Sequence, residues 1–596
     1  MSETSGAESG GRPASADDDW DSIDEAVRDQ LGQLLTAGTN LFSGSDLMGR
    51  LDPLSLFSPL LRTGLAAAAR PDKIAGVVTR TGGEMLRATA AAAVRATGGN
   101  SSYTPKRGKD RRFTDPAWTS NAGYWWLREI YQDWEQSLLE IVRDTETSPA
   151  IKQKAEFAVQ LIIDALAPTN FALGNPAVIK KALDTGGLSL AKGARNLVDD
   201  LRTNRGAPRQ VVAGEHTVGE DMAVTPGKVV FRNDLMELIQ YAPSTAEVHE
   251  IPLLFSPPWI NKYYIMDLAP GRSLVQWAVD HGHTVFMISY RNPDERMRNV
   301  QMDDYLISGP IAALEVVRNI TGAAKVNLLG LCLGGTLTMA SLAYLDAVGL
   351  ELINSATFLN TLIDFSEPGL LGVFTDEASI RRLEKTMKRT GFLPKEDMQR
   401  SFNLLRTNDL IWNYVVSSWL MGEEPSAFDL LSWNNDSTRM PAGMHTFYLR
   451  SCYVENQLAR GVMELAGQRL DLAKVDQDLY FLSAEQDHIA PWRSSYSGAR
   501  LPAGDVRFVL SNSGHIAGIV NPPSPKSIHR VLEGNKPLPA DPAEWMAAAT
   551  VHPVTWWEDW AEWISARAGA MRKPPRMGSR KHRPITDAPG TYVLEA

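Results

Sequence analysis

The stretch from Lys325 to Ala340 constrains the fold of this chain more than any other part of its sequence. An apolar run, Val326–Leu329, leads into Gly330-Leu-Cys332-Leu-Gly334-Gly335, and small and apolar residues of helical type follow. A strand that turns sharply into a helix needs tiny side chains around the corner, because the backbones crowd together there. This order predicts an elbow that presents Cys332 as a nucleophile. The backbone N–H of Leu333, at the start of the helix, is then the first oxyanion donor.

Two downstream residues complete a catalytic constellation with Cys332. Asp487 follows the apolar run Leu479–Ser483, and His515 follows the apolar run Val506–Leu510, so each is expected just beyond a strand. Nucleophile, acid and histidine in this chain order are typical of α/β-hydrolases, and all three would meet at the carboxyl edge of the sheet. We therefore expect an acyl intermediate on Cys332, with His515 as general base and Asp487 orienting it.

Other interpretations of these residues remain open. Cys332 could be a buried cysteine in a βα turn, Asp487 a turn aspartate, and His515 a loop histidine that binds backbone. His488 is the main competitor for the base, but it lies beside the acid rather than across from it. We assign His488 to the substrate channel. Cys452 lacks the elbow pattern and is predicted to be structural.

The spacing of apolar residues along the sequence changes near residue 210. Residues 1–20 are polar and predicted to be disordered, and 21–210 form a helical N-terminal domain. Its helical pattern is weak up to about 100 and strong over about 123–143 and 151–166. From 211 to 596 short apolar runs alternate with helical stretches, which predicts a mostly parallel sheet of the α/β-hydrolase fold. The pattern breaks over about 362–476, which we interpret as a helical, Trp-rich cap insertion.

Composition excludes several classes of protein. The formal net charge of −10 and a pI near 5.6 argue against a nucleic-acid-binding surface. Two cysteines are too few for a disulfide framework or a thiolate zinc site, and neither a phosphate-binding loop nor a ligand-spaced cluster suggests a metal or cofactor. The uncharged stretch Val326–Leu345 is long enough to span a membrane, but its change of period favours a buried strand and helix. We expect a cytoplasmic protein without a transmembrane segment.

A cysteine at the elbow favours acyl transfer from thioesters. Attack of a thiolate on an acyl thioester exchanges one thioester for another at little thermodynamic cost, and the acyl-cysteine can still acylate an alcohol. A serine ester would lose that driving force. A cysteine-based thioesterase or esterase remains the alternative from the same fold.

Several segments together resemble the polyhydroxyalkanoate synthases. The resemblance runs from about Arg112 to Glu595, and Tyr290 stands where the family usually has Trp. The elbow is similar to the lipase-like box of that family with cysteine in place of serine. The other matching segments are Ala167–Phe171, Pro257–Leu268, His281–Asp294, Asn408–Asn413, Phe428–Asp436, Asp487–Trp492, Gly514–Gly518 and Pro589–Val593.

The resemblance implies a polymerase of (R)-3-hydroxyacyl-CoA, in particular 3-hydroxybutyryl-CoA, that releases CoA and extends a polyester held on Cys332. It points to the single-subunit, short-chain-length class, while a medium-chain preference stays open. It also leaves open whether Asp487 orients His515 or activates the chain hydroxyl. The segment that begins at Pro257 implies a second oxyanion donor, the backbone N–H of Trp259 or Ile260.

The family also implies a setting and partners. Its members form homodimers on granules of their own polyester, and the N-terminal domain and the Trp-rich stretch 556–563 are candidates for these contacts. Core packing is the other role we expect for those tryptophans. Trp433 is a further candidate for the substrate channel. An inactive granule-associated protein that keeps the fold is the alternative outside catalysis.

Overall fold

The computed structural model describes residues 53–103, 110–212, 214–534 and 537–595. It divides the chain into two compact units. Unit 1 takes the chain up to Arg209 together with Thr407–Glu424, and unit 2 takes Gln210–Arg406 together with Pro425–Ala596. The predicted disordered head, 1–20, lies outside the described residues, as does the start of the predicted helical domain.

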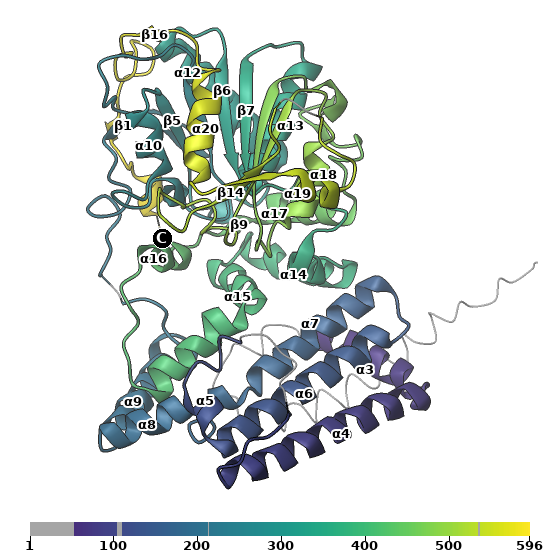
Figure 1. Ribbon diagram of the computed structural model, residues 1–596. Helices are drawn as coiled ribbons and strands as arrows, with labels where there is room; N and C mark the ends of the chain where they lie inside the picture. Colours follow the sequence, from purple (N-terminus) through teal and green to yellow (C-terminus); the bar gives the residue numbers. More distant parts are fainter. Residues whose placement is uncertain (1–52, 104–109, 213, 535–536, 596) are drawn as a thin grey trace, which may run out of the picture. The chain divides into compact units, whose positions relative to one another are not determined.

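Unit 1 is built from helices (Figure 1). The two helices with strong sequence periodicity are present as α6 and α7, and each begins where a polar side chain caps the first backbone N–H groups. Asn121 accepts from Gly123 and Tyr124 N–H before α6, and Ser148 accepts from Ile151 N–H before α7. The helices of unit 1 are α3 (Pro53–Ala68), α4 (Pro71–Ala96), α5 (Ala117–Ser120), α6 (Ala122–Asp144), α7 (Pro149–Ala165), α8 (Pro176–Asp184) and α9 (Leu188–Thr203).

The helical pattern before residue 100 is weak in the sequence, but the structure has a long helix there, α4. This helix runs for 26 residues straight through Gly76, Gly82 and Gly83. A helix-interior glycine costs about 1 kcal/mol relative to alanine, and here tertiary contacts outweigh that cost. The Arg95 guanidinium lies over the Trp125 ring at 4.4 Å, and the Trp126 indole N–H donates to Thr89 Oγ1 at 2.9 Å.

Unit 1 also contains a segment from the middle of the chain. The π-helices η6 (Asn408–Trp412) and η7 (Val415–Leu420) lie in Thr407–Glu424, which the sequence analysis placed in the cap insertion. Asn196 Nδ2 donates to the Ser418 carbonyl at 3.2 Å, and Trp419 Nε1 donates to Asp200 Oδ2 at 2.8 Å. Gly193 allows the crossing, since a Cβ there would lie 2.0 Å from the Trp419 oxygen.

Unit 2 holds an 11-stranded sheet whose centre is parallel and whose margins are antiparallel (Figure 1). The apolar runs Val326–Leu329, Leu479–Ser483 and Val506–Leu510 are present as strands β6, β12 and β13, whereas β2 was not anticipated because the buried polar residues Glu237 and Gln240 interrupt its apolar run. The strands in spatial order are β15 (Thr550–His552), β14 (His529–Val531), β13 (Val506–Ser511), β12 (Asp478–Ala484), β7 (Ile353–Leu359), β6 (Val326–Leu331), β4 (Leu253–Ser256), β5 (Val285–Tyr290), β2 (Met236–Tyr241), β1 (Gly227–Arg232) and β17 (Thr586–Asp587).

Each face of the sheet is covered by its own core. Alternation along β6 sends Val326 and Leu328 into one cluster and Leu329 and Leu331 into the other. The first cluster includes α12 (Ala312–Thr321), α13 (Leu333–Ala347), α18 (Trp492–Ala499) and α19 (Pro542–Ala548). The second includes α10 (Leu274–Asp280) and α20 (Trp556–Ser565).

The two apolar stretches left ambiguous by the sequence are both core elements. Val326–Leu345 is strand β6 turning into helix α13. The four tryptophans of α20 are buried, at 0 to 9% exposure. No helix in the described ranges has the length and apolar character needed to cross a bilayer.

A helical insertion separates β7 from β12, as expected. The main helices of its part in unit 2 are η5 (Gly369–Phe374), α14 (Glu377–Thr390), α15 (Lys395–Leu405), α16 (Asp429–Asn435), α17 (Ala442–Phe447) and the π-helix η8 (Tyr448–Val454). We call these elements the cap.

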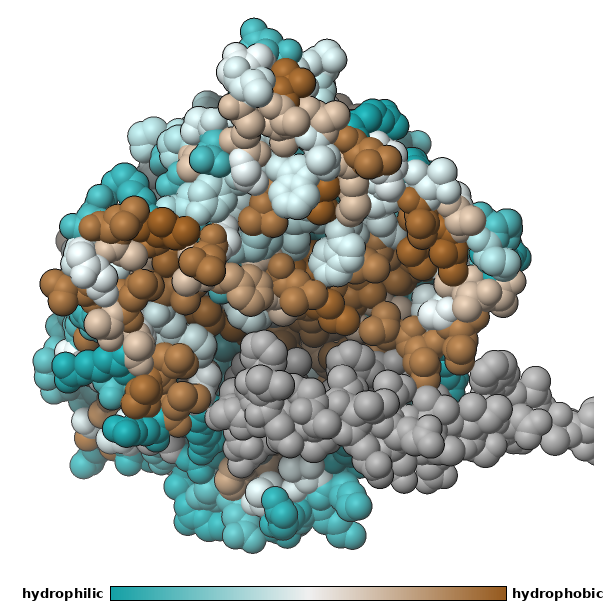
Figure 2. Space-filling model, turned by 90° about the horizontal axis from the view of Figure 1, so that it is seen from below, coloured by the Kyte–Doolittle hydropathy of each residue, from teal (hydrophilic) through white to brown (hydrophobic). Residues whose placement is uncertain are grey.

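Unit 1 exposes many large apolar side chains. On α4, Val78, Leu86 and Val94 are all exposed. Leu173 and Leu183 are 87% and 77% exposed. Figure 2 shows apolar residues interspersed with polar ones on the face seen from below.

Candidate active site

The sequence around Cys332 folds as the predicted elbow. Cys332 lies between the last residue of β6 and the first residue of α13, with φ 52° and ψ −119°, a left-handed conformation that L-residues adopt only under constraint. Its backbone N–H donates to the Leu359 carbonyl at the end of β7, at 2.9 Å. The strained corner is thereby fixed to the neighbouring strand.

The three glycines of the elbow are required by close backbone approach. A Cβ on Gly330 would lie 2.5 Å from the Gly335 Cα, and one on Gly335 would lie 2.0 Å from Thr361 Oγ1. A Cβ on Gly334 would lie 2.1 Å from the Ser256 oxygen. The start of α13 can therefore pack against β4 and β7 only because these positions lack side chains.

Asp487 and His515 form a hydrogen-bonded pair at the carboxyl ends of β12 and β13. His515 Nδ1–H donates to Asp487 Oδ2 at 2.6 Å, and both residues are buried. Asp487 Oδ1 accepts the backbone N–H groups of Ile489 and Ala490, each at 2.8 Å. This arrangement fixes the carboxylate and leaves His515 Nε2 as the nitrogen that can act as a base.

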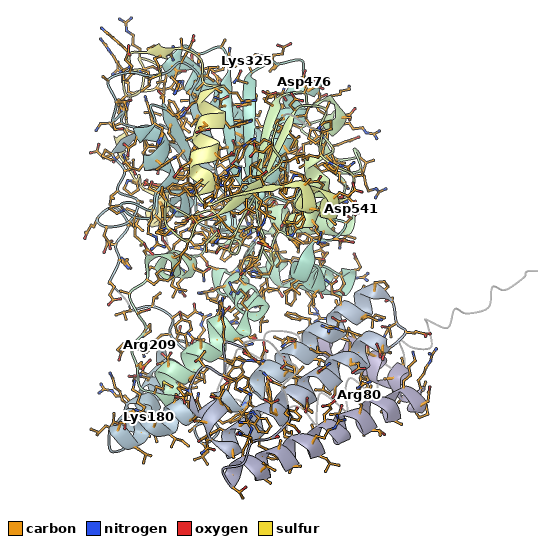
Figure 3. All side chains as sticks on the ribbon, in the orientation of Figure 1. Arg80, Lys180, Arg209, Lys325, Asp476 and Asp541 are labelled. Carbon is orange, nitrogen blue, oxygen red and sulfur yellow. The ribbon has the colours of Figure 1, made fainter. Side chains whose placement is uncertain are left out.

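The three residues meet at one end of the sheet. Figure 3 labels Lys325 and Asp476, which precede β6 and β12, at the upper end of unit 2. The carboxyl ends of both strands, where Cys332 and Asp487 follow, therefore lie at the opposite end.

Electrostatics stabilise the charged form of His515. Burial alone would lower its pKa, but the Asp487 carboxylate and the Cys332 sulfur outweigh burial, and their charge and hydrogen bonds raise the pKa of His515 to about 10. The His515 side chain is within hydrogen-bonding reach of the Cys332 sulfur. An imidazole placed beside a thiol in this way can take its proton and activate the sulfur as a nucleophile.

The predicted oxyanion donors lie beside the elbow. Gly334 approaches the Ser256 and Pro257 carbonyl oxygens, so the loop after β4 packs directly on the start of α13. Pro257 and Pro258 have no N–H, and the first backbone donors after β4 therefore belong to Trp259 and Ile260. The Trp259 carbonyl is held by the Thr438 hydroxyl at 3.1 Å.

The two channel candidates occupy different positions. Trp433, on α16, is buried, and its Nε1–H donates to the Lys262 carbonyl at 2.8 Å. Trp433 shares the core cluster against which Cys332 packs. His488 is half-buried beside the acid, and its carbonyl oxygen faces Gly369 of the cap. Their roles in a channel stay predictions.

Sequence reasoning missed three residues close to the site. Tyr448 and Tyr453, on η8, join their hydroxyls at 3.1 Å, and the Cys332 charge contributes, after burial, to the raised pKa of each phenol. Asn360, at the end of β7, donates through Nδ2 to the His515 carbonyl. The sequence gives no sign of these roles, because tyrosines in the cap resemble packing residues and an asparagine after a strand resembles a loop residue. In the described part of the chain, His, Cys, Asp and Glu side chains form no group of three fit for a metal ion.

A largely parallel sheet with a nucleophile elbow and an acid–histidine pair at its carboxyl edge defines a protein of the alpha/beta hydrolase fold, whose family description matches residues 263–522. The poly(3-hydroxyalkanoate) polymerase of Methylorubrum extorquens is 44% identical to this chain over 490 residues, covering 81% of this chain and 80% of that protein. The chain belongs to the poly(3-hydroxyalkanoate) polymerase family and is an acyltransferase.

Further comparisons agree. The poly(3-hydroxyalkanoate) polymerase subunit PhaC of Cupriavidus necator is 41% identical, covering 81% of this chain and 83% of that protein. Poly(3-hydroxyalkanoate) polymerase 1 of Ectopseudomonas oleovorans is 40% identical, covering 83% and 88%. Residues 109–278 match the N-terminus of poly-beta-hydroxybutyrate polymerase (PhaC). The resemblance seen in the sequence is confirmed at the level of the family.

Proposed function

We propose that this enzyme polymerises (R)-3-hydroxyacyl-CoA, with 3-hydroxybutyryl-CoA as its substrate, through acyl intermediates on Cys332. The observation that carries the proposal is the elbow cysteine interacting with a buried histidine whose Nδ1–H is bound by Asp487 at 2.6 Å. That arrangement supplies a nucleophile, a base and an orienting acid in one constellation. Membership of the polymerase family supports a polymer as the product.

In the acylation step, the Cys332 thiolate attacks the thioester carbonyl of the substrate. The carbonyl oxygen gains negative charge, which the backbone N–H groups of Leu333 and of Trp259 or Ile260 stabilise. The C–S bond to CoA then breaks, His515 gives its proton to the departing CoA thiolate, and an acyl-cysteine remains. One thioester replaces another, so the step is close to neutral in energy.

In the elongation step, the hydroxyl of one hydroxyacyl unit attacks an acyl-cysteine carbonyl. His515 Nε2 accepts the hydroxyl proton as the new ester bond forms, and it returns that proton to the Cys332 sulfur. Asp487 acts by orienting His515. This role is favoured because Oδ1 already accepts two backbone N–H groups and Oδ2 binds His515, so the carboxylate is committed to the protein.

The setting of the reaction is part of the proposal. We infer a cytoplasmic enzyme built from one kind of subunit, which forms a homodimer and works at the surface of its own polyester granule. The exposed apolar side chains of unit 1, among them Leu86 and Leu173, are suited to contact with a hydrophobic polymer. The CoA thioester is the substrate, and the proposal needs no cofactor.

The test is CoA release from (R)-3-hydroxybutyryl-CoA by the purified protein, with the extractable product sized. Cys332→Ala is run beside it, and Cys452→Ala serves as the matched control because Cys452 is the other cysteine and is buried on η8, outside the elbow sequence. High-mass polyester made by wild type and by Cys452→Ala, and lost in Cys332→Ala, supports the proposal. Free 3-hydroxybutyrate without polymer would instead establish a thioesterase, and polymer from Cys332→Ala would remove Cys332 from the mechanism.

A further inference from the structure

We propose that Asn360 is a positioning residue, which holds the His515 loop in register with the strand beside Cys332. Asn360 follows directly after β7 and is fully buried. Its Nδ2 donates to the backbone carbonyl of His515, 155 residues further along the chain. This inference rests on the proposed role of the Cys332–His515 pair.

Asn360 connects the strands that carry the three catalytic candidates. Its own N–H donates to the Leu482 carbonyl of β12 at 2.8 Å, two strand positions before the end of the strand that leads to Asp487. The preceding residue, Leu359, accepts the N–H of Cys332 at 2.9 Å. Two consecutive residues, the last of β7 and the one after it, thus contact the backbone of the nucleophile, the strand of the acid and the backbone of the base.

The side chain is kept in place against three costs. Asn360 has a φ of 45°, in the left-handed region that non-glycine residues avoid. Its amide is removed from water completely, and its Oδ1 is buried without a hydrogen-bond partner among the described residues. A residue needed only to end a strand would avoid these costs, since glycine would adopt this backbone freely. The bond to His515 is what the asparagine adds.

The His515 carbonyl fixes the orientation of the amide. Rotating the amide by half a turn would point Oδ1 at the carbonyl oxygen, placing two acceptors together, so Nδ2 is the atom that must face His515. The bond holds the backbone of the base itself. His515 is therefore anchored through its carbonyl by Asn360 and through Nδ1 by Asp487. Two anchors define where Nε2 lies relative to Cys332.

The experiment measures the alkylation rate of Cys332 by iodoacetamide against pH in the full-length protein. Asn360→Gly removes the amide but keeps the left-handed backbone accessible, and Asn360→Asp keeps the shape but replaces the donor with an acceptor. Asn456→Gly is the matched control, because Asn456 is the other described asparagine with a positive φ, 47°, and it binds Asp364 in a separate contact. Cys452→Ala is the background of every variant, so that only Cys332 can react, and His515→Ala gives the limit of a thiol without its base.

We expect the alkylation profile of both Asn360 variants to move toward that of His515→Ala, by about one pH unit or more, with kcat for CoA release reduced about 10-fold or more and KM changed little. Asn456→Gly should match the background protein. The thermal midpoint is recorded for each variant, because lost stability alone would not move a pH profile in the folded protein.

Two results would overturn the inference. The first is an unchanged alkylation profile in Asn360→Gly while His515→Ala is shifted, which leaves the proposed catalytic pair standing without Asn360. The second is the same profile for the background protein and His515→Ala, which removes the pair itself. The two failures are distinguished by the His515→Ala arm.

Discussion

Replacing Asp487 by asparagine is the sharpest test of how the site activates its thiol. The variant keeps the size of the side chain, and its remaining carbonyl oxygen can still accept the N–H groups of Ile489 and Ala490. Its amide nitrogen then faces His515 Nδ1, which must become an acceptor and place the ring proton on Nε2. The imidazole would present a proton to Cys332 where the reaction needs a lone pair.

The structure sets the size of the loss. A pKa of about 10 for His515, against 6.5 for an ordinary histidine, corresponds to about 5 kcal/mol in favour of the imidazolium at ~1.4 kcal/mol per pH unit. Asp487 and Cys332 share this stabilisation. If half of it depends on the carboxylate, the equilibrium constant for protonating His515 falls about 50-fold, and if all of it does, about 3000-fold. We expect kcat for CoA release to fall within these bounds.

The assay follows CoA release from (R)-3-hydroxybutyryl-CoA under saturating substrate, with Cys332 alkylation as a second readout. Asp478→Asn is the matched control, because Asp478 begins the same strand at the opposite end of the sheet and pairs with Arg567 at 2.8 Å. It should retain full activity. A loss of less than about 10-fold in Asp487→Asn, with the fold intact, would refute the argument that this carboxylate orients and charges the base.

Three further outcomes are expected. Cys332→Ser should lower CoA release by at least about 10³-fold while the protein stays folded, since His515 must then deprotonate a far weaker acid, and near wild-type polymerisation would contradict the thioester argument. Gly334→Ala should lower the free energy of unfolding in urea by more than about 3 kcal/mol, because its Cβ would lie 2.1 Å from the Ser256 oxygen and backbone would have to move; a change below about 1 kcal/mol would show that the elbow is looser than described. The folded-state pKa of His515 is raised, so its contribution to the stability of the fold is complete below about pH 6.5 and is lost as the pH rises through about 10. The difference in free energy of unfolding in urea between wild type and Asp487→Asn should therefore shrink between about pH 7 and 10.5. A difference that grows with pH would contradict this reasoning.

The elbow and the acid–histidine pair could be predicted because each depends on a few local rules. Gly330, Gly334 and Gly335 are dictated by close backbone contact, and strand ends place Asp487 and His515 at one edge of a parallel sheet. These constraints act within short segments, so they leave a mark on the sequence. The same holds for the capped, periodic helices α6 and α7.

The remaining features depend on contacts between distant residues. Helix α4 persists through three glycines because it packs on α6, and no local propensity signals that packing. In strand β2 the buried polar residues Glu237 and Gln240 interrupt the apolar run, and they bind Thr591 and Arg576 far along the chain. Asn360 acts through a bond to a residue far along the chain. Tyr448 and Tyr453 lie on η8 of the cap, far along the chain from Cys332.

The inclusion of Thr407–Glu424 in unit 1 has a consequence for dissecting the protein into pieces. A fragment that begins at Gln210 would carry this segment without the side chains of Asn196 and Asp200 that bind it, and it would leave the Ser418 carbonyl and the Trp419 indole N–H without these partners. Such a fragment invites aggregation, whatever the state of its active site. A self-contained catalytic fragment should instead join Arg406 to Pro425 through a short polar linker, and a self-contained unit 1 should be co-expressed with the excised segment as a peptide.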